Sequence, residues 1–254
     1  MRILITNDDG IRAAGIELLE RIALSFSDDV TVVAPAEEQS GKGRSLTLTT
    51  PIRLRSIDAR HHAVSGTPTD AVIMALALIM KDAPPDLILS GINRGANLGE
   101  DVSYSGTVAA AMEGALAGIP SIALSQVYAR PGMGADVPFA VAEAWGRRVL
   151  EPLIGMDWAP RTLVNVNFPP VDADAVQGVR VVQQGLRDYR LPTLERGTDP
   201  RGFDYYWLNH GRIRQTASAA TDLEAIGQGY VTVTPLHLDM THQPSKATLE
   251  ALYP

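Results

Sequence analysis

The sequence predicts an α/β fold in which a mostly parallel sheet carries helices on both faces. Two observations in its 254 residues indicate this class. Strand-like runs alternate with segments of helical periodicity over the first two-thirds of the chain, which is typical of crossover connections between parallel strands. The opening segment, residues 2–6, is a short apolar run, as expected of a strand buried on both faces. The length allows one large domain or a core with an appendage.

Each predicted element has its own local signal. After the strand at 2–6, apolar residues recur at helical spacing between residues 11 and 26, and a β-branched strand at 30–34 ends at Pro35. Thr67 suits an N-cap and Pro68 the first position of a helix that runs to residue 80. The later predicted strands are 86–89, 121–124 and 162–166, and the later helices are 108–116, which Gly118 and Pro120 end, and 137–150.

In the last third of the chain the regular alternation of strand-like and helical segments ends. Residues 179–183 and 205–209 look extended, and between them lies a segment rich in proline, glycine and charge. Composition alone leaves a projecting hairpin and a surface loop equally open. A short helix at 221–227, a strand in "GYVTVTPL" and a terminal helix in "SKATLEALY" complete the prediction.

Composition excludes several classes of function. The net charge of −7 argues against binding to a nucleic-acid polymer, which requires neutralisation of phosphates by basic residues. The absence of cysteine excludes disulfides and thiolate metal sites. The longest apolar stretch, residues 71–80, is too short to span a bilayer, and no leader segment opens the chain. We therefore expect a cytoplasmic protein without membrane contacts.

Polar loops follow three of the predicted strands. "NDDG" carries Asp8 and Asp9, "PAEEQSGKGRS" carries Ser40, and "SGINRGANLGEDVSYSGTV" carries Asn93 and Asn97. Ligands bind beyond the carboxyl ends of parallel strands, so these loops should share one rim. Carboxylate, hydroxyl and amide oxygens suit Mg²⁺ or Mn²⁺, and a cation would offset the repulsion between adjacent aspartates. The alternative is a polar turn in which an aspartate caps the next helix.

A second feature lies just before the helix at 108–116. Ser103, Ser105, Gly106 and Thr107 precede it, so free backbone N–H groups and the positive end of the helix dipole face this loop. This arrangement predicts a phosphate site, and an ordinary Ser/Thr cap is the alternative. Carboxylates beside a phosphate site indicate a metal-assisted phosphoryl reaction. "SGKGRS" lacks the spacing of a P-loop, and "GINRGANLG" does not match the dinucleotide fingerprint.

Several motifs together resemble one known family. "ILITNDDG", "APAEEQSG", "SGTPTDAV", "NVNFP" and the long stretch from "SGINRGANLGEDVSYSGTV" to "SIALS" are similar to those of the SurE family, the stationary-phase survival proteins that act as 5′-nucleotidases. The resemblance extends over about the first 170 residues, and "GYVTVTPL" continues it. Ala71 departs from the cysteine of many relatives, at a position that is not a ligand.

The resemblance implies a fold, a reaction and a site. It implies a Rossmann-like three-layer core at 1–182, a projecting hairpin at 183–215 for oligomer contacts, and a returning helix and strand with a helical tail at 216–254. It implies a homodimer or homotetramer formed by segment exchange. The reaction would be hydrolysis of nucleoside 5′-monophosphates, and activity on 3′-nucleotides or short polyphosphate, which the family allows, stays open. One Mn²⁺ or Mg²⁺ per subunit would bind Asp8, Asp9, Ser40 and Asn93, and phosphate would contact Asn97, Ser103, Ser105, Gly106 and Thr107.

The sequence leaves the attacking group and two other functions open. A metal-activated water or the Asp8 carboxylate could attack phosphorus, so Asp8 and Asp9 are the candidate catalytic residues. A module that senses a nucleotide without turnover would use the same loops. A haloacid-dehalogenase-type phosphatase is disfavoured, because that class separates its two aspartates by one residue, whereas these are adjacent.

Overall fold

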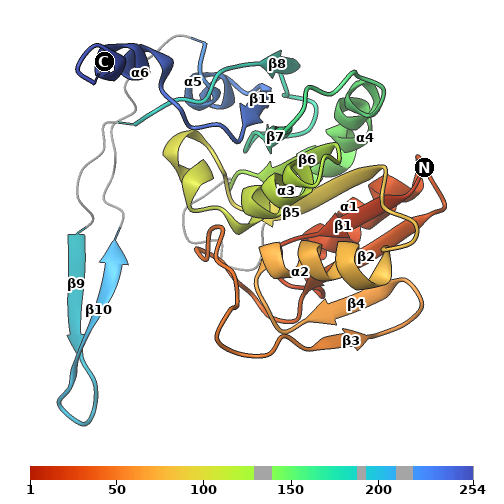
Figure 1. The fold of residues 1–254 in the computed structure, drawn as a ribbon, viewed down its shortest axis with the longest axis horizontal. Helices are drawn as coiled ribbons and strands as arrows, with labels where there is room; N and C mark the ends of the chain where they lie inside the picture. Colours follow the sequence, from red (N-terminus) through yellow and green to blue (C-terminus); the bar gives the residue numbers. More distant parts are fainter. Residues whose placement is uncertain (129–138, 188–192, 210–219, 254) are drawn as a thin grey trace.

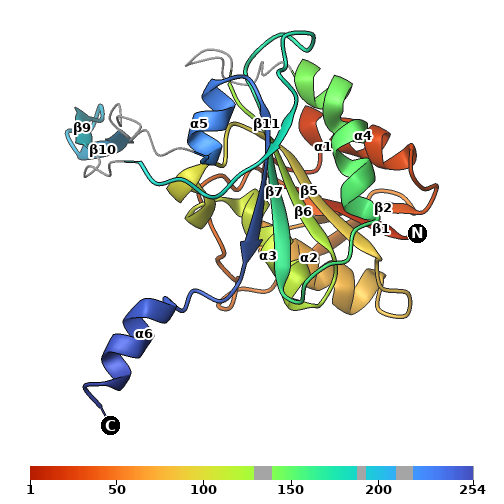
Figure 2. The same ribbon diagram turned by 90° about the horizontal axis from the view of Figure 1, so that it is seen from above.

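A nine-stranded sheet forms the centre of the molecule (Figures 1 and 2). The structure is a computed structural model that describes residues 1–128, 139–187, 193–209 and 220–253. The order of the strands is β3-β4-β2-β1-β5-β6-β7-β11-β8. Their bounds are β1 Ile3–Thr6, β2 Val30–Pro35, β3 Leu54–Ser56, β4 His61–Val64, β5 Leu87–Arg94, β6 Ser121–Gln126, β7 Thr162–Phe168, β8 Val179–Val181 and β11 Val231–His237.

The sheet is mostly parallel, as the sequence predicted. The run from β4 through β7 is parallel throughout. The exceptions are β3, which pairs antiparallel with β4, and β11, which pairs antiparallel with β7 and parallel with β8. The carboxyl ends of β1, β2 and β5 therefore lie at the same edge.

Helices cover both faces of this sheet, which confirms the α/β class. Helices α1 (Ala14–Leu24) and α4 (Ala140–Ile154) lie on one face, and α2 (Pro68–Met74) and α3 (Gly106–Leu116) lie on the other (Figure 2). Thr67 caps α2 by accepting a hydrogen bond from Asp70 N, and the helix continues as a π-helical turn, Ala75–Ile79. The first residues of the predicted helix 137–150 lie outside the described residues.

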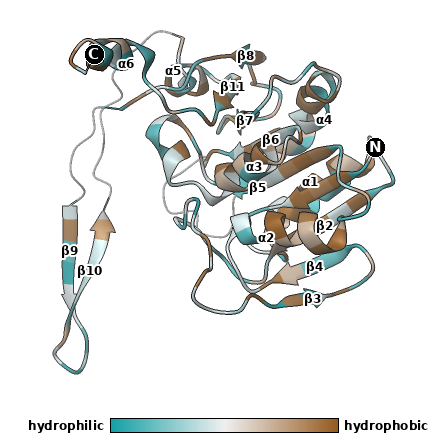
Figure 3. Ribbon diagram, in the orientation of Figure 1, coloured by the Kyte–Doolittle hydropathy of each residue, from teal (hydrophilic) through white to brown (hydrophobic). Residues whose placement is uncertain are grey.

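The hydrophobic core lies on both faces of the central strands. Successive side chains of a strand point to opposite faces of the sheet. Ile3, Ile5 and Leu89 therefore pack under α1 and α4, while Leu4 and Ile88 pack under α2. The central strands and the helix faces above them are coloured mostly hydrophobic in Figure 3. This rigid centre fixes the position of the loops at the carboxyl edge.

A two-stranded hairpin and a terminal helix extend away from the core. The hairpin consists of β9 (Thr193–Thr198) and β10 (Asp204–Asn209), and the helix is α6 (Gln243–Glu250) (Figures 1 and 2). The predicted extended segment at 179–183 is not part of this hairpin, because β8 joins the main sheet. A short helix, α5 (Asp222–Gly227), precedes β11. No helix among the described residues is long and apolar enough to cross a membrane.

Candidate active site

Three loops of the carboxyl edge meet around the end of β1. Gln39 N, in the loop after β2, donates to Asp8 O at 2.7 Å. Arg94 N, at the end of β5, donates to Asp9 Oδ2 at 3.0 Å. Thr107 Oγ1, in the first turn of α3, donates to Asp8 Oδ1 at 2.5 Å. The structure therefore places the three polar loops of the sequence against one another.

The turn after β1 is closed by Asn7. Its Nδ2 donates to Gly10 O at 2.8 Å, and its Oδ1 accepts from Gly10 N at 3.2 Å. Gly10 has a φ of 100°, which is a conformation that residues with a Cβ rarely adopt. This closed turn lets both aspartates leave the regular alternation of a strand and lie on the rim.

Asp8 is a nearly buried carboxylate. It is 4% exposed, and the pKa of Asp8 is raised from 3.8 to about 6, chiefly by burial and in smaller part by the charge of Asp9. The hydrogen bonds from Thr107 act in the opposite direction and do not offset the burial. A divalent cation at this carboxylate would remove that electrostatic cost.

Asp9 is paired with a cation from the neighbouring strand. Its side chain is 5% exposed, and the Arg94 Nε atom lies 3.7 Å from its Oδ1. Burial raises the pKa of Asp9, while the hydrogen bond and charge of Arg94 lower it. Arg94 Nη2 also contacts Glu38 Oε2 at 3.2 Å. The positive charge expected beside the aspartate pair is therefore supplied in part by the protein.

Ser40 and Asn93 lie on the two loops that flank the aspartates. Ser40 Oγ donates to Glu38 Oε1 at 2.9 Å. Asn93 Nδ2 donates to Gly95 O at 3.0 Å, and none of the described residues donates to Asn93 Oδ1. The amide oxygen of Asn93 is thus available as a ligand. Ser40 would first have to release Glu38, or share its hydroxyl oxygen with the cation.

The start of α3 packs directly on Asp8. Ser105 is the N-cap, and its hydroxyl accepts from Val108 N at 3.0 Å. A Cβ at Gly106 would lie 2.8 Å from the Asp8 Cβ and 2.9 Å from its Oδ2, closer than such atoms approach in proteins. The glycine therefore allows the helix terminus and the carboxylate to share one small space. Free N–H groups in such a place favour an anion.

The other two predicted phosphate residues occupy different environments. Asn97 is buried, and its Nδ2 donates to Ser125 Oγ at 2.8 Å while its carbonyl accepts from Asn165 and Asn167. Ser103 is exposed, and its hydroxyl donates to Glu100 O at 2.7 Å. Asn97 thus anchors its loop to β6 and β7, whereas Ser103 is at the surface.

The donor chemistry at the rim fits a hard divalent cation. Asp8 and Asp9 lie between the loops that carry Ser40 and Asn93, and carboxylate, hydroxyl and amide oxygens suit Mg²⁺ or Mn²⁺ as ligands. No group of three or more His, Asp or Glu side chains that could hold a metal occurs among the described residues. A site here would therefore depend on Ser40 and Asn93 in addition to the aspartates.

Sequence reasoning missed several residues of this rim. The pairing of Arg94 with both Asp9 and Glu38 has no sequence signature, because it joins three loops that are distant in the chain. Asn165 and Asn167 were visible in "NVNFP", and their strand period of two was the signal that both face Asn97. A cavity of about 630 Å³ adjoins Asp9 and is lined by Arg12, Arg55, Arg94 and Phe139, among others.

The fold and the rim together define an α/β protein with an acidic, oxygen-rich site beside a helix N-terminus. The family model described as "Survival protein SurE" matches residues 3–191. The 5′-nucleotidase SurE of Rhizorhabdus wittichii is 65% identical over 253 residues, covering 100% of each chain, and that of Erythrobacter litoralis is 56% identical over 241 residues, covering 95% of each. The crystal structure of the SurE protein from Aquifex aeolicus has 37% sequence identity and a TM-score of 0.82, with 100% of both chains covered. This chain belongs to the SurE family.

Proposed function

We propose that this enzyme is a divalent-metal-dependent phosphomonoesterase that hydrolyses nucleoside 5′-monophosphates to a nucleoside and phosphate. The relatives named 5′-nucleotidase SurE match it over 95–100% of their length and support the class of substrate. The single observation that carries the proposal is the contact of Asp8 with the first turn of α3. It brings a candidate metal ligand and a candidate phosphate site within reach of one ester.

Asp8, Asp9, Ser40 and Asn93 would hold the cation. When bound, it supplies Lewis acidity at a phosphate oxygen and offsets the charge of the aspartates. Arg94 holds Asp9 through its backbone and side chain, which limits the positions that the carboxylate can adopt. These contacts keep the aspartates oriented before substrate binds.

The phosphate would be bound by the loop that leads into α3. N–H groups at Gly106 and Thr107 and the hydroxyl of Ser105 would donate to its equatorial oxygens, with Asn97 and Ser103 on the same loop. Donors that are fixed before the reaction stabilise charge in the transition state without reorganisation. The Asp8 carboxylate or a metal-activated water would attack phosphorus as the bond to the nucleoside oxygen breaks, and Asp8 lies at this rim.

The experiment is phosphate release from a panel of nucleoside 5′- and 3′-monophosphates and short polyphosphate, with Mn²⁺, Mg²⁺ or a chelator. We expect release from 5′-monophosphates that stops on chelation and returns on addition of metal. Asp8→Asn should lose most activity and bind metal more weakly, whereas Asp174→Asn, at an exposed position, should match the wild type. Tight nucleotide binding without release would instead favour the sensing module.

The hairpin and the terminal helix support a further part of the proposal. Hairpin side chains such as Phe203, Trp207 and Leu208 are about two-thirds exposed, and no residue of α6 is buried. Exposed apolar residues on such extensions favour association between copies of the chain. We expect a homodimer or homotetramer, formed by exchange of these segments, in the cytoplasm. Light scattering of the purified protein measures the assembly.

A further inference from the structure

The loop between β5 and α3 connects two parts of the site, and near its start Asn97 anchors it to β6 and β7. It runs from Gly95 to Ser105 and contains a single 3-10 turn, Gly99–Ser103. Under the proposed function it joins a metal ligand, Asn93, to the phosphate site at the start of α3. The position of this loop therefore determines how the two halves of the site meet. Its middle is held by side chains from much later in the chain.

Asp222 holds the loop from inside the protein. This carboxylate is fully buried at the first residue of α5. Its Oδ2 accepts from Gly99 N at 2.8 Å, and its Oδ1 accepts from Gly185 N and Leu223 N, each at 2.8 Å. One carboxylate thus joins the active-site loop, the segment after β8 and the start of α5. Only a group with two acceptor oxygens can serve all three donors.

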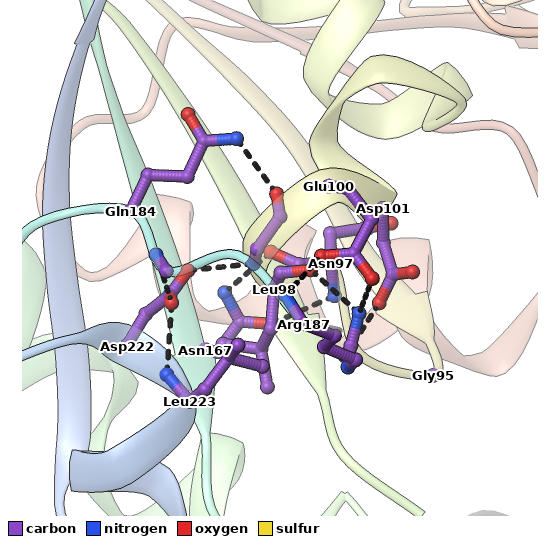
Figure 4. Close-up of polar contacts among 12 residues, drawn as sticks. Gly95, Asn97, Leu98, Glu100, Asp101, Asn167, Gln184, Arg187, Asp222 and Leu223 are labelled. Atoms are coloured by element: carbon purple, nitrogen blue, oxygen red, sulfur yellow. Dashed lines mark hydrogen bonds and ion pairs between the residues drawn. The ribbon is translucent and has the colours of Figure 1, made fainter. Parts of the chain in front are cut away.

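Arg187 holds the same loop from its outer side. It lies between β8 and β9, and its guanidinium donates to Glu100 Oε1 at 3.1 Å, Asp101 Oδ2 at 2.9 Å and Leu98 O at 3.3 Å. Its backbone N–H donates to Glu100 Oε2 at 3.0 Å. Figure 4 shows the Arg187 side chain directed at both acids, with Asp222 on the other side of the loop. Gln184 adds a bond to Gly99 O at 2.8 Å.

Arg187 also sets the charge of the loop. Glu100 and Asp101 are adjacent acids, two to five residues before the predicted phosphate residues Ser103 and Ser105. Burial by itself would raise the pKa of Glu100, but the hydrogen bonds and charge of Arg187 outweigh it and lower that pKa. Without the guanidinium, Glu100, whose side chain is only 19% exposed, would carry an unpaired negative charge on the loop that leads to the phosphate site, whereas Asp101, at 42% exposed, would be screened in part by solvent.

We propose that Arg187 and Asp222 are positioning residues for the phosphate-binding loop. Asp222 fixes the backbone at Gly99, and Arg187 fixes Leu98, Glu100 and Asp101 and neutralises the two acids. Neither residue contacts the reacting atoms. The segment that leads to the projecting hairpin is thereby fastened to the active-site loop. This inference rests on the proposed function and assigns residues outside the family's metal and phosphate motifs.

The first experiment separates the charge of Arg187 from its role in stability. In Arg187→Met we expect KM for a nucleoside 5′-monophosphate to rise on the order of tenfold, and inhibition by inorganic phosphate to weaken in parallel. Adding Glu100→Gln and Asp101→Asn to Arg187→Met should recover most of the loss in KM. Arg180→Met, which removes a nearby arginine that stacks on Tyr230, should leave KM unchanged.

The second experiment tests Asp222 without changing its size. Asp222→Asn replaces one acceptor oxygen by a donor, so at least one of the three N–H groups loses its partner. We expect kcat/KM to fall on the order of tenfold and phosphate inhibition to weaken, measured well below the unfolding temperature. A residue that acted only on stability would lower the unfolding temperature and leave the phosphate inhibition constant unchanged.

The outcomes distinguish this proposal from the proposed function. A wild-type protein that releases no phosphate from any nucleotide would refute the function itself. If the wild type is active, an unchanged KM in Arg187→Met, or a raised KM that persists after both acids are neutralised, overturns the positioning proposal. If Arg187→Met does not fold, Asp222→Asn provides the test. Phosphate inhibition that is unaltered in Asp222→Asn would then overturn the positioning proposal.

Discussion

Replacing Asp8 by asparagine should stabilise the metal-free protein. The carboxylate is almost completely buried, and its pKa is raised from an ordinary 3.8 to about 6, with burial as the largest cause. Each pKa unit corresponds to about 1.4 kcal/mol, so the ionised side chain costs up to about 3 kcal/mol at neutral pH. Asparagine has no charge to bury, and its oxygen can still accept the hydrogen bond from Thr107.

The stability gained by Asp8→Asn should increase with pH. A raised pKa means that the folded protein holds a proton that the unfolded chain has released between pH 3.8 and about 6. The wild-type protein is therefore free of this penalty below pH 3.8 and carries all of it above pH 6. The advantage of Asp8→Asn should be about 3 kcal/mol at pH 7.5 and about 1 kcal/mol at pH 4.5.

Denaturant unfolding of chelator-treated protein measures both values, and thermal unfolding should show an increase of roughly 6–12 °C at neutral pH. The exposed control, Asp174→Asn, should change stability by less than about 0.5 kcal/mol. Added Mn²⁺ should reverse the order, because it stabilises the wild type by binding the folded state. A metal-free Asp8→Asn protein that is no more stable than the wild type at pH 7.5 would refute the electrostatic account of this rim.

Three further perturbations test other parts of the structure. Gly106→Ala should place a methyl group against Asp8, cost about 1–3 kcal/mol of stability and remove most activity, as measured by unfolding and phosphate release. Phe168→Ala should cost about 3–5 kcal/mol, because this side chain is fully buried in the core. Burial alone would lower the pKa of His61, but Asp58 and Glu20, each 2.9 Å from a ring nitrogen, raise it. The two acids therefore stabilise the folded protein below pH 6.5, where His61 is protonated, and this stability is lost as the pH rises through the raised pKa. His61→Gln should accordingly lower the unfolding temperature more at pH 5.5 than at pH 8.5, and an equal loss at both would contradict that sign.

Local signals in the sequence were sufficient for most of the core. Thr67 and Pro68 mark the start of α2 because capping depends on neighbours in the chain, and the apolar run before Asp8 marks β1 because both its faces are buried. The antiparallel insertion of β11 between β7 and β8 could not be predicted, since alternation in "GYVTVTPL" indicates a strand without indicating its neighbours.

The candidate site could be predicted where chemistry is concentrated in one loop. "NDDG" by itself indicates a metal site and "SYSGT" by itself indicates a phosphate site, and the hydrogen bond from Thr107 to Asp8 joins the two motifs. The partners that hold these loops were not predictable, because Arg94 and Asp222 are ordinary charged residues in the sequence. Their importance arises from burial and from hydrogen bonds that connect distant segments, such as that between Asp222 and Gly99.

The attachment of the β5–α3 loop to Asp222 has a consequence for biosynthesis. On the ribosome, the aspartates and the start of α3 emerge before Asp222. Asp222, which secures their connecting loop, follows the start of α3 by more than a hundred residues. A truncated product ending after β7 would contain every side chain assigned here to metal and phosphate and would still lack the fastening that sets their spacing. Under the proposed function, we expect such a product to bind phosphate more weakly than the chain that includes Asp222.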